Sequence, residues 1–185
     1  MKSYRSYVLF SLWLMFSYFL NETAVAAMRL GTLDPMILTW ATMPGTVMHE
    51  GSHYIMSLLL GGHPMSFDVM PRAFYVDGEL AAILQGSVLF KINEYNGAAS
   101  ALAPLLLVPM PAFFTWLSMK ADGLLLRMVF LYFAVCAWNA FMPSSIDFEL
   151  AVRESSSWST ALFVLPFAFI LNCLVLYFVA ARYNR

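Results

Sequence analysis

The sequence predicts an all-α polytopic membrane protein, with about five transmembrane helices and a small membrane-associated β-hairpin region. The first observation is composition: 61% of the 185 residues are hydrophobic and 11% are charged. In soluble domains, roughly 45–50% of the residues are hydrophobic and roughly 25% are charged. A soluble chain of this size has too much surface for its volume to bury so much apolar area. The second observation is that apolar stretches near the bilayer-spanning length of about 20 residues recur along the chain.

The first apolar run covers residues 7–20 and follows Lys2 and Arg5. It is short, and the small residues 24–27 that come after it also resemble a signal-peptide cleavage site. We favour a retained anchor helix, because the next helix would then carry the chain back across the membrane. Cleavage is the alternative.

Four further apolar segments are expected as helices: 36–60, 97–119, 124–142 and 160–181. Three prolines interrupt the segment 97–119, and prolines kink helices but are tolerated in membranes. The polar stretch 62–96 contains short apolar alternations at 73–76 and 87–90, which indicate a loop with a β-hairpin. Strand edges cannot face lipid, so we expect this region at the membrane surface, packed on protein or in contact with water.

Charge excludes one class of partner. The net charge is −1 and lysines and arginines are scattered singly, so no basic run is present that could follow phosphates, and nucleic acid is not expected as a partner. The lipid bilayer is expected as a partner instead. Basic residues divide equally between the two sides of the membrane, so the positive-inside rule does not decide orientation. The sequence does not predict an oligomeric state.

The chemistry is concentrated in His49-Glu50-Gly51-Ser52-His53. On a helix, His49 and His53 lie on one face, about 5–6 Å apart at Cβ, and two imidazoles at this spacing can bind one zinc ion. Zinc lowers the pKa of bound water to about 7, and Glu50 is placed to take a proton from it, as in H-E-x-x-H proteases. Ionisable residues are rare in membrane helices and are usually functional there. The alternative is that His49, Glu50 and His53 form a polar cluster that packs between helices.

A catalytic zinc needs a third protein ligand. The candidates are His63, Asp68, Asp77, Glu79, Asp122, Asp147 and Glu149. We prefer Asp147, because it directly follows an apolar segment and a Pro143-Ser144-Ser145 stretch that could return it to membrane depth. Glu149 is the weaker rival. The alternative for Asp147 is an aspartate that caps a helix or lies in a loop.

These residues resemble the site-2 protease family of intramembrane metalloproteases. Four parts of the sequence match the family pattern in order: His49 to His53, the pair Gly61-Gly62, the stretch Ala103-Pro104-Leu105-Leu106, and Asn139, Pro143 and Asp147. The family's usual Asp-Gly pair is Asp147-Phe148 here. Ser144-Ser145 also replace more apolar residues.

The resemblance implies zinc binding by His49, His53 and Asp147, Glu50 as general base, and Asn139 as a residue that holds the substrate. It implies hydrolysis of peptide bonds in membrane-spanning protein substrates. The chain would comprise an N-terminal anchor with its connecting loop (1–34), a metalloprotease core (35–150) and a C-terminal transmembrane helix (151–185). We expect a multi-pass protein of a bacterial or archaeal cytoplasmic membrane.

Two other functions are considered. One is a catalytically inactive zinc-binding membrane protein that acts as a binding or chaperone-like partner. The other is a metal transporter or another zinc-dependent membrane enzyme. We rank the transporter last, because its polar residues would be spread through several helices.

Overall fold

A computed structural model describes residues 2–76 and 79–183, and the fold is mostly helical, as predicted. The chain forms two compact units, each assembled from segments distant in the sequence. Unit 1 comprises Met1–Val47, Val69–Gly86 and Met110–Ala140, and unit 2 comprises Met48–Asp68, Ser87–Pro109 and Phe141–Arg185.

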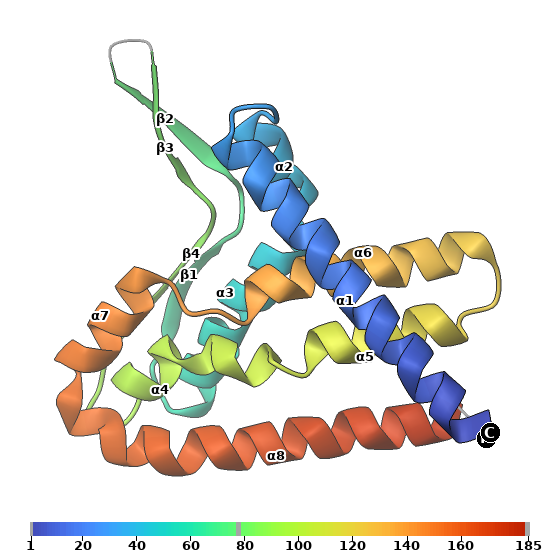
Figure 1. Ribbon diagram of the computed structural model, residues 1–185. Helices are drawn as coiled ribbons and strands as arrows, with labels where there is room; N and C mark the ends of the chain where they lie inside the picture. The colour runs from blue at the N-terminus through green and yellow to red at the C-terminus, as the bar shows by residue number, and fades with distance from the viewer. Residues whose placement is uncertain (1, 77–78, 184–185) are drawn as a thin grey trace. The chain divides into compact units, whose positions relative to one another are not determined.

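Unit 1 is built around an antiparallel pair of helices, α5 (Met110–Lys120) and α6 (Leu124–Ala140), which lie side by side in Figure 1. Gly123 turns the chain between them with a φ of 87°, a conformation that glycine adopts without steric cost. The Arg127 Nε donates to the Ala121 carbonyl at 3.0 Å and satisfies a carbonyl at the end of α5.

The N-terminal helix α1 (Lys2–Arg29) packs on both α5 and α6. Polar side chains join it to α6: the Trp138 Nε1 donates to the Ser17 Oγ at 3.0 Å, and the Asn139 Nδ2 donates to the Asn21 Oδ1 at 2.6 Å. Ser17 and Asn21 are buried. The helix therefore continues well past the predicted run 7–20, and its polar residues serve packing.

The predicted helix 36–60 is divided in the structure. It forms α2 (Pro35–Ala41) and α3 (Met43–Leu59), separated at Thr42. Pro44 lies in the first turn of α3 and has no N–H for the carbonyl four residues earlier, which favours a break at this point. The Ala41 carbonyl at the break accepts a hydrogen bond from the Tyr132 hydroxyl of α6 at 2.6 Å.

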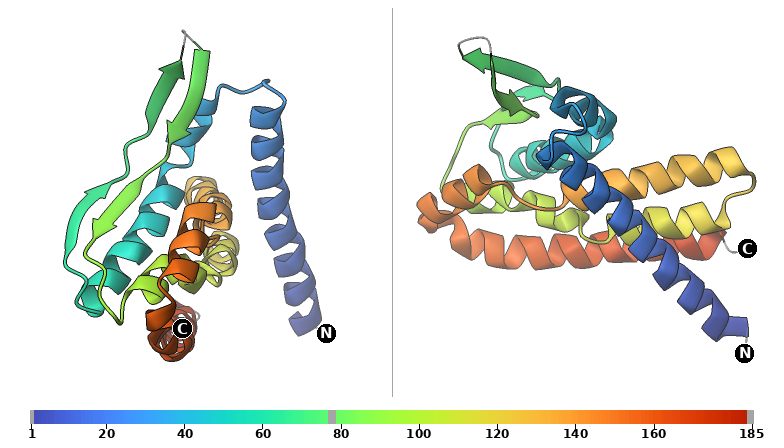
Figure 2. Two further views of the ribbon diagram at one scale, coloured as in Figure 1. Left: turned by 90° about the vertical axis from the view of Figure 1, so that its left-hand side faces the viewer. Right: turned by 45° about the horizontal axis from the view of Figure 1, so that its top comes forward.

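Four strands form two antiparallel pairs within the described part of the chain. In unit 1, β2 (Arg72–Val76) pairs with β3 (Glu79–Leu84), seen as a twisted ribbon in Figure 2. In unit 2, β1 (Pro64–Asp68) pairs with β4 (Ser87–Phe90). The strands predicted at 73–76 and 87–90 are confirmed.

Unit 2 packs the rest of α3 with α4 (Gly97–Ala101), the 3-10 turn η1 (Ala103–Leu107), α7 (Ser145–Arg153), the 3-10 turn η2 (Ser155–Ser157) and α8 (Trp158–Tyr183). Its core is made largely of small side chains: Met56, Ala98, Ala99, Ala101, Leu102, Ala103, Ala151 and Ala161. Small residues let helix backbones approach closely, as they do in membrane bundles.

The predicted segment 97–119 is three elements, α4, η1 and α5, and α5 belongs to unit 1. Pro104, Pro109 and Pro111 remove three backbone donors within eight residues, more than one continuous helix can absorb. The predicted helices 124–142 and 160–181 are confirmed as α6 and α8, with small shifts at their ends.

Two of the described helices are long and apolar enough to cross a membrane, over Ser6–Arg29 and Trp158–Ala181. A third span results if α6 and α7 together count as one. The prediction of five spans is therefore not confirmed. With 17 and 11 residues, α3 and α5 are shorter than the roughly 20 residues that span a bilayer.

Candidate metal centre

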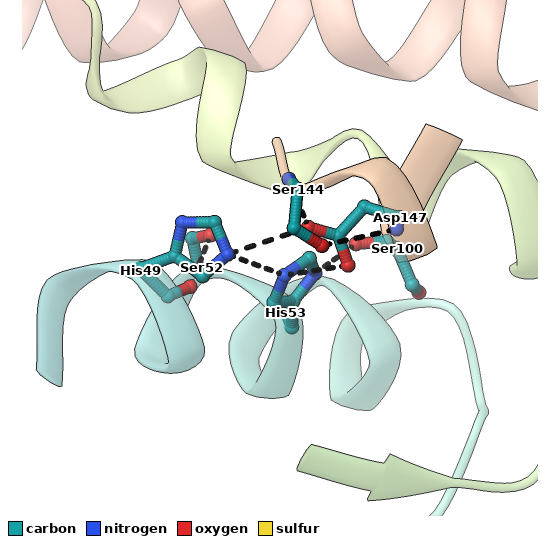
Figure 3. Close-up of polar contacts among 6 residues, drawn as sticks. All are labelled: His49, Ser52, His53, Ser100, Ser144 and Asp147. Carbon is teal, nitrogen blue, oxygen red and sulfur yellow. Dashed lines mark hydrogen bonds and ion pairs between the residues drawn. The ribbon is translucent and has the colours of Figure 1, made fainter. Parts of the chain in front are cut away.

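Helix α3 presents His49 and His53 one turn apart, on one face. Their ring centroids lie 4.8 Å apart and their Nε2 atoms 3.2 Å apart. Figure 3 shows both rings turned toward the same point above the helix. The two imidazoles that the sequence predicted as a pair are thus in position to share one ion.

Helix α7 supplies the third group. One oxygen of Asp147, Oδ2, lies 3.4 Å from the His49 Nε2, and the other, Oδ1, lies 3.4 Å from the His53 Nε2. Across the residues that the structure describes, His49, His53 and Asp147 form the group of His, Cys, Asp or Glu side chains that could hold a metal ion. Of the two neighbouring carboxylates on α7, it is Asp147 that joins the histidines, and Glu149 does not.

The spacing of these atoms can be compared with that around a tetrahedral ion. Zinc bonds to nitrogen and oxygen of about 2.0–2.2 Å place any two ligand atoms of a tetrahedron about 3.3–3.6 Å apart. The three separations measured here are 3.2, 3.4 and 3.4 Å. The two Asp147 distances involve different oxygens of the carboxylate; with one ligand atom taken from each residue, the three atoms all lie within 4.8 Å of one another, close enough to hold one ion.

Hydrogen bonding fixes which nitrogen of His53 faces the group. The His53 Nδ1 lies 2.7 Å from the Ser100 carbonyl oxygen, which can only accept, so Nδ1 carries the proton. In the neutral ring, Nε2 then presents a lone pair to the Asp147 carboxylate.

Asp147 is oriented by the start of its own helix. Ser144 is the N-cap of α7: its Oγ accepts from the Asp147 N–H at 3.2 Å, and its own N–H donates to the Asp147 Oδ2 at 2.6 Å. This reciprocal pair is a capping box. Asp147 therefore also takes part in capping α7, as the alternative interpretation predicted, and the same carboxylate faces both histidines.

The other predicted site residues are placed as follows. Glu50 is partly buried and interacts electrostatically with all three members of the group. Asn139 belongs to unit 1, where it binds Asn21. Among the rival ligands, His63, Asp68 and Asp122 lie outside the group, Asp77 lies outside the described residues, and Glu79 begins β3.

Two contributors were not predicted from the sequence, the Ser100 carbonyl and the Ser144 cap. Ser144 could have been found, because Ser-x-x-Asp before an apolar helix is the capping-box pattern. The Ser100 carbonyl is a backbone atom and gives no direct signal in the sequence.

The three members of the group differ in how deeply their side chains are buried. The His53 side chain is 6% exposed, whereas those of His49 and Asp147 are each 15% exposed. The group is thus closed on the His53 side and more accessible on the other.

Comparisons of the chain with family descriptions, curated proteins and solved structures gave no match.

Proposed function

We propose that this protein is an intramembrane zinc metalloprotease, of the kind that the resemblance to site-2 proteases implies, with zinc held by His49, His53 and Asp147. The observation that carries the proposal is the metal geometry. One ligand atom from each of three residues on two helices lies within 4.8 Å of the other two, and the glutamate of an H-E-x-x-H motif adjoins them.

Two histidines and one carboxylate suit zinc, which binds imidazole nitrogen and carboxylate oxygen in catalytic sites with one position left open. When bound, the ion would polarise a substrate carbonyl and acidify water. The chain's own residues supply the rest. His49, His53 and Asp147 fix the ion, and Glu50 accepts a proton at its carboxylate and returns it to the leaving amine.

The substrate class follows from the surroundings. Exposed apolar side chains cover much of α8, including Phe163, Phe167 and Phe178, so lipid is the surrounding that fits this helix best. We propose membrane-spanning segments as substrates and about five spans for the chain. A helix hides its peptide bonds in internal hydrogen bonds, so a substrate must unwind at the cleavage point, and helix-breaking residues there would favour cleavage.

Glu50 offers the sharpest test of the enzyme class. The protein, reconstituted in lipid with zinc, is incubated with single-span peptides that carry a fluorophore and a quencher on either side of a glycine-containing segment. Wild type is expected to cleave at least one of them. Glu50→Gln is expected to lose about 10²–10⁴-fold in rate and to keep its zinc, because the ligands are untouched.

Glu149→Gln is the matched control, since it makes the same chemical change to a carboxylate outside the metal group. It should cleave at the wild-type rate. Undiminished cleavage by Glu50→Gln would contradict the role of Glu50. Wild-type protein that holds one zinc ion and cleaves none of the peptides would instead favour the zinc-binding partner protein.

A further inference from the structure

One backbone carbonyl connects α4 to the metal group. In a regular α-helix the carbonyl of residue 100 accepts a hydrogen bond from the N–H of residue 104. Residue 104 is a proline and has no N–H. Helix α4 ends at Ala101, and Pro104 lies in the first turn of η1. The Leu102 N–H reaches the carbonyls of both Ala98 and Ser100, so a lone pair on the Ser100 oxygen remains for another donor.

That donor is a metal-site histidine. The His53 Nδ1 lies 2.7 Å from the Ser100 oxygen, and His53, Ser100 and Pro104 are all buried. A carbonyl released by a proline in an apolar interior needs a new partner, since water is not at hand. His53 meets this need with its Nδ1 proton.

We propose that Pro104 is a positioning residue for the metal site. By withholding a backbone N–H, it reserves the Ser100 carbonyl for His53, fixes the Nδ1-protonated tautomer, and so directs the Nε2 lone pair at the ion. A histidine ligand whose other nitrogen is held in this way has a defined ring orientation and greater basicity. The inference rests on the proposed metal site.

The contact also requires that α4 keep its place beside α3. Two asparagines secure this. The Asn93 Nδ2 donates to the Leu60 carbonyl at the end of α3 at 3.0 Å, and the buried Asn96 donates to the Lys91 carbonyl at 2.9 Å. Gly62 passes so close that a Cβ there would collide with the Asn96 amide and the Ser57 hydroxyl. Gly62→Ala therefore offers a second way to displace α4 without touching the metal group.

The simpler explanation is that Pro104 only ends α4. Under that explanation, Pro104→Ala would change stability and leave the tautomer of His53 as it was. Under the proposal, the new N–H of residue 104 competes for the Ser100 carbonyl, and His53 loses its fixed tautomer. The two explanations thus differ in a spectroscopic quantity.

The test is nitrogen-15 NMR of histidine-labelled protein in detergent, without metal, at a pH where imidazole is neutral. The chain has three histidines, so single substitutions at each can assign the spectrum. Wild-type His53 is expected in the Nδ1–H form. Pro104→Ala is expected to give a mixture of tautomers and to bind zinc or cobalt about 10–100-fold more weakly. Pro166→Ala, which removes a proline inside α8, is the control and should change neither quantity.

An Nε2–H tautomer in the wild type, or wild-type tautomer and affinity in Pro104→Ala, would overturn the proposal. If Pro104→Ala does not fold, two other measurements test the proposal: the tautomer of His53 in the wild type, and the metal affinity of Gly62→Ala. Pro166→Ala remains the control, because Pro166 lies in α8, outside the metal group. If the wild-type protein binds no metal but Pro104→Ala still shifts the tautomer of His53, the proposed function is contradicted. The orientation of His53 by Pro104 is then still supported.

Discussion

Ser144 and Asp147 hold each other in place at the start of α7, through one hydrogen bond in each direction, of 2.6 and 3.2 Å. The Asp147 oxygen that accepts from the Ser144 N–H also lies 3.4 Å from the His49 Nε2. The first turn of a helix and the third corner of the metal group are therefore one structural feature. Folding of α7 and orientation of the ligand should respond together when the cap is weakened.

Ser144→Ala removes the hydroxyl that accepts from the Asp147 N–H. Loss of an N-cap side chain costs about 1 kcal/mol of stability, and a less firmly held ligand should weaken zinc binding by about tenfold or more. Thermal unfolding and zinc competition against a chelator measure the two effects. Ser145→Ala, one residue further on and exposed, should change neither, and an equal effect of the two substitutions would count against the coupling.

Asp147→Asn separates the cap from the ligand. The amide oxygen can still accept from the Ser144 N–H, but the side chain no longer carries the negative charge that a zinc ligand supplies. The helical content by circular dichroism should stay at the wild-type level while zinc affinity falls by far more than in Ser144→Ala. If Asp147→Asn binds zinc as tightly as wild type, the third ligand is another residue.

Gly45 faces the backbone of α6 inside unit 1. A Cβ at this position would lie 2.5 Å from the Cys136 carbonyl oxygen, and neither backbone can yield without a shift. Gly45→Ala should therefore lower the unfolding temperature, with a loss of about 1–3 kcal/mol, the usual range for overpacking. Gly51→Ala, in the same helix but with open space around it, should be neutral or stabilising. Equal unfolding temperatures for the two variants would contradict the close approach.

Helix α1 should be retained in the mature protein, because its buried Asn21 binds Asn139 and its buried Ser17 binds Trp138. An N-terminal tag is thus expected on the intact protein in mass spectrometry. Side-chain hydrogen bonds between membrane helices contribute about 0.6 kcal/mol on average, so a double-mutant cycle of Asn21→Ala and Asn139→Ala should give a coupling of that order. Loss of the tag at residues 24–27 would show that the segment is a cleaved signal.

The long apolar helices and the pairing of His49 with His53 could be predicted from this sequence for different reasons. Apolar runs such as 124–142 and 160–181 appear as α6 and α8 because an uninterrupted apolar stretch has few other ways to satisfy its backbone. His49 and His53 could be paired because helical spacing alone brings them together.

The breaks were harder to predict. The division at Thr42 and the three pieces between Gly97 and Lys120 lie near prolines, and carbonyls close to them find distant donors: Tyr132 for the Ala41 carbonyl and His53 for the Ser100 carbonyl. Those partners are distant in the sequence. Asp147 could be preferred over Glu149 from its position, and the Ser-x-x-Asp capping-box pattern is a further local signal that distinguishes the two carboxylates.

The measurement that tests the central claim most directly is the zinc content of purified wild type, His49→Ala, Asp147→Ala and the matched controls His63→Ala and Glu149→Ala. The account predicts about one zinc ion per chain in wild type and in both controls, and a strong loss in His49→Ala and Asp147→Ala. Wild-type protein that binds no zinc after zinc is supplied would contradict it, and so would Asp147→Ala protein that keeps a full zinc ion.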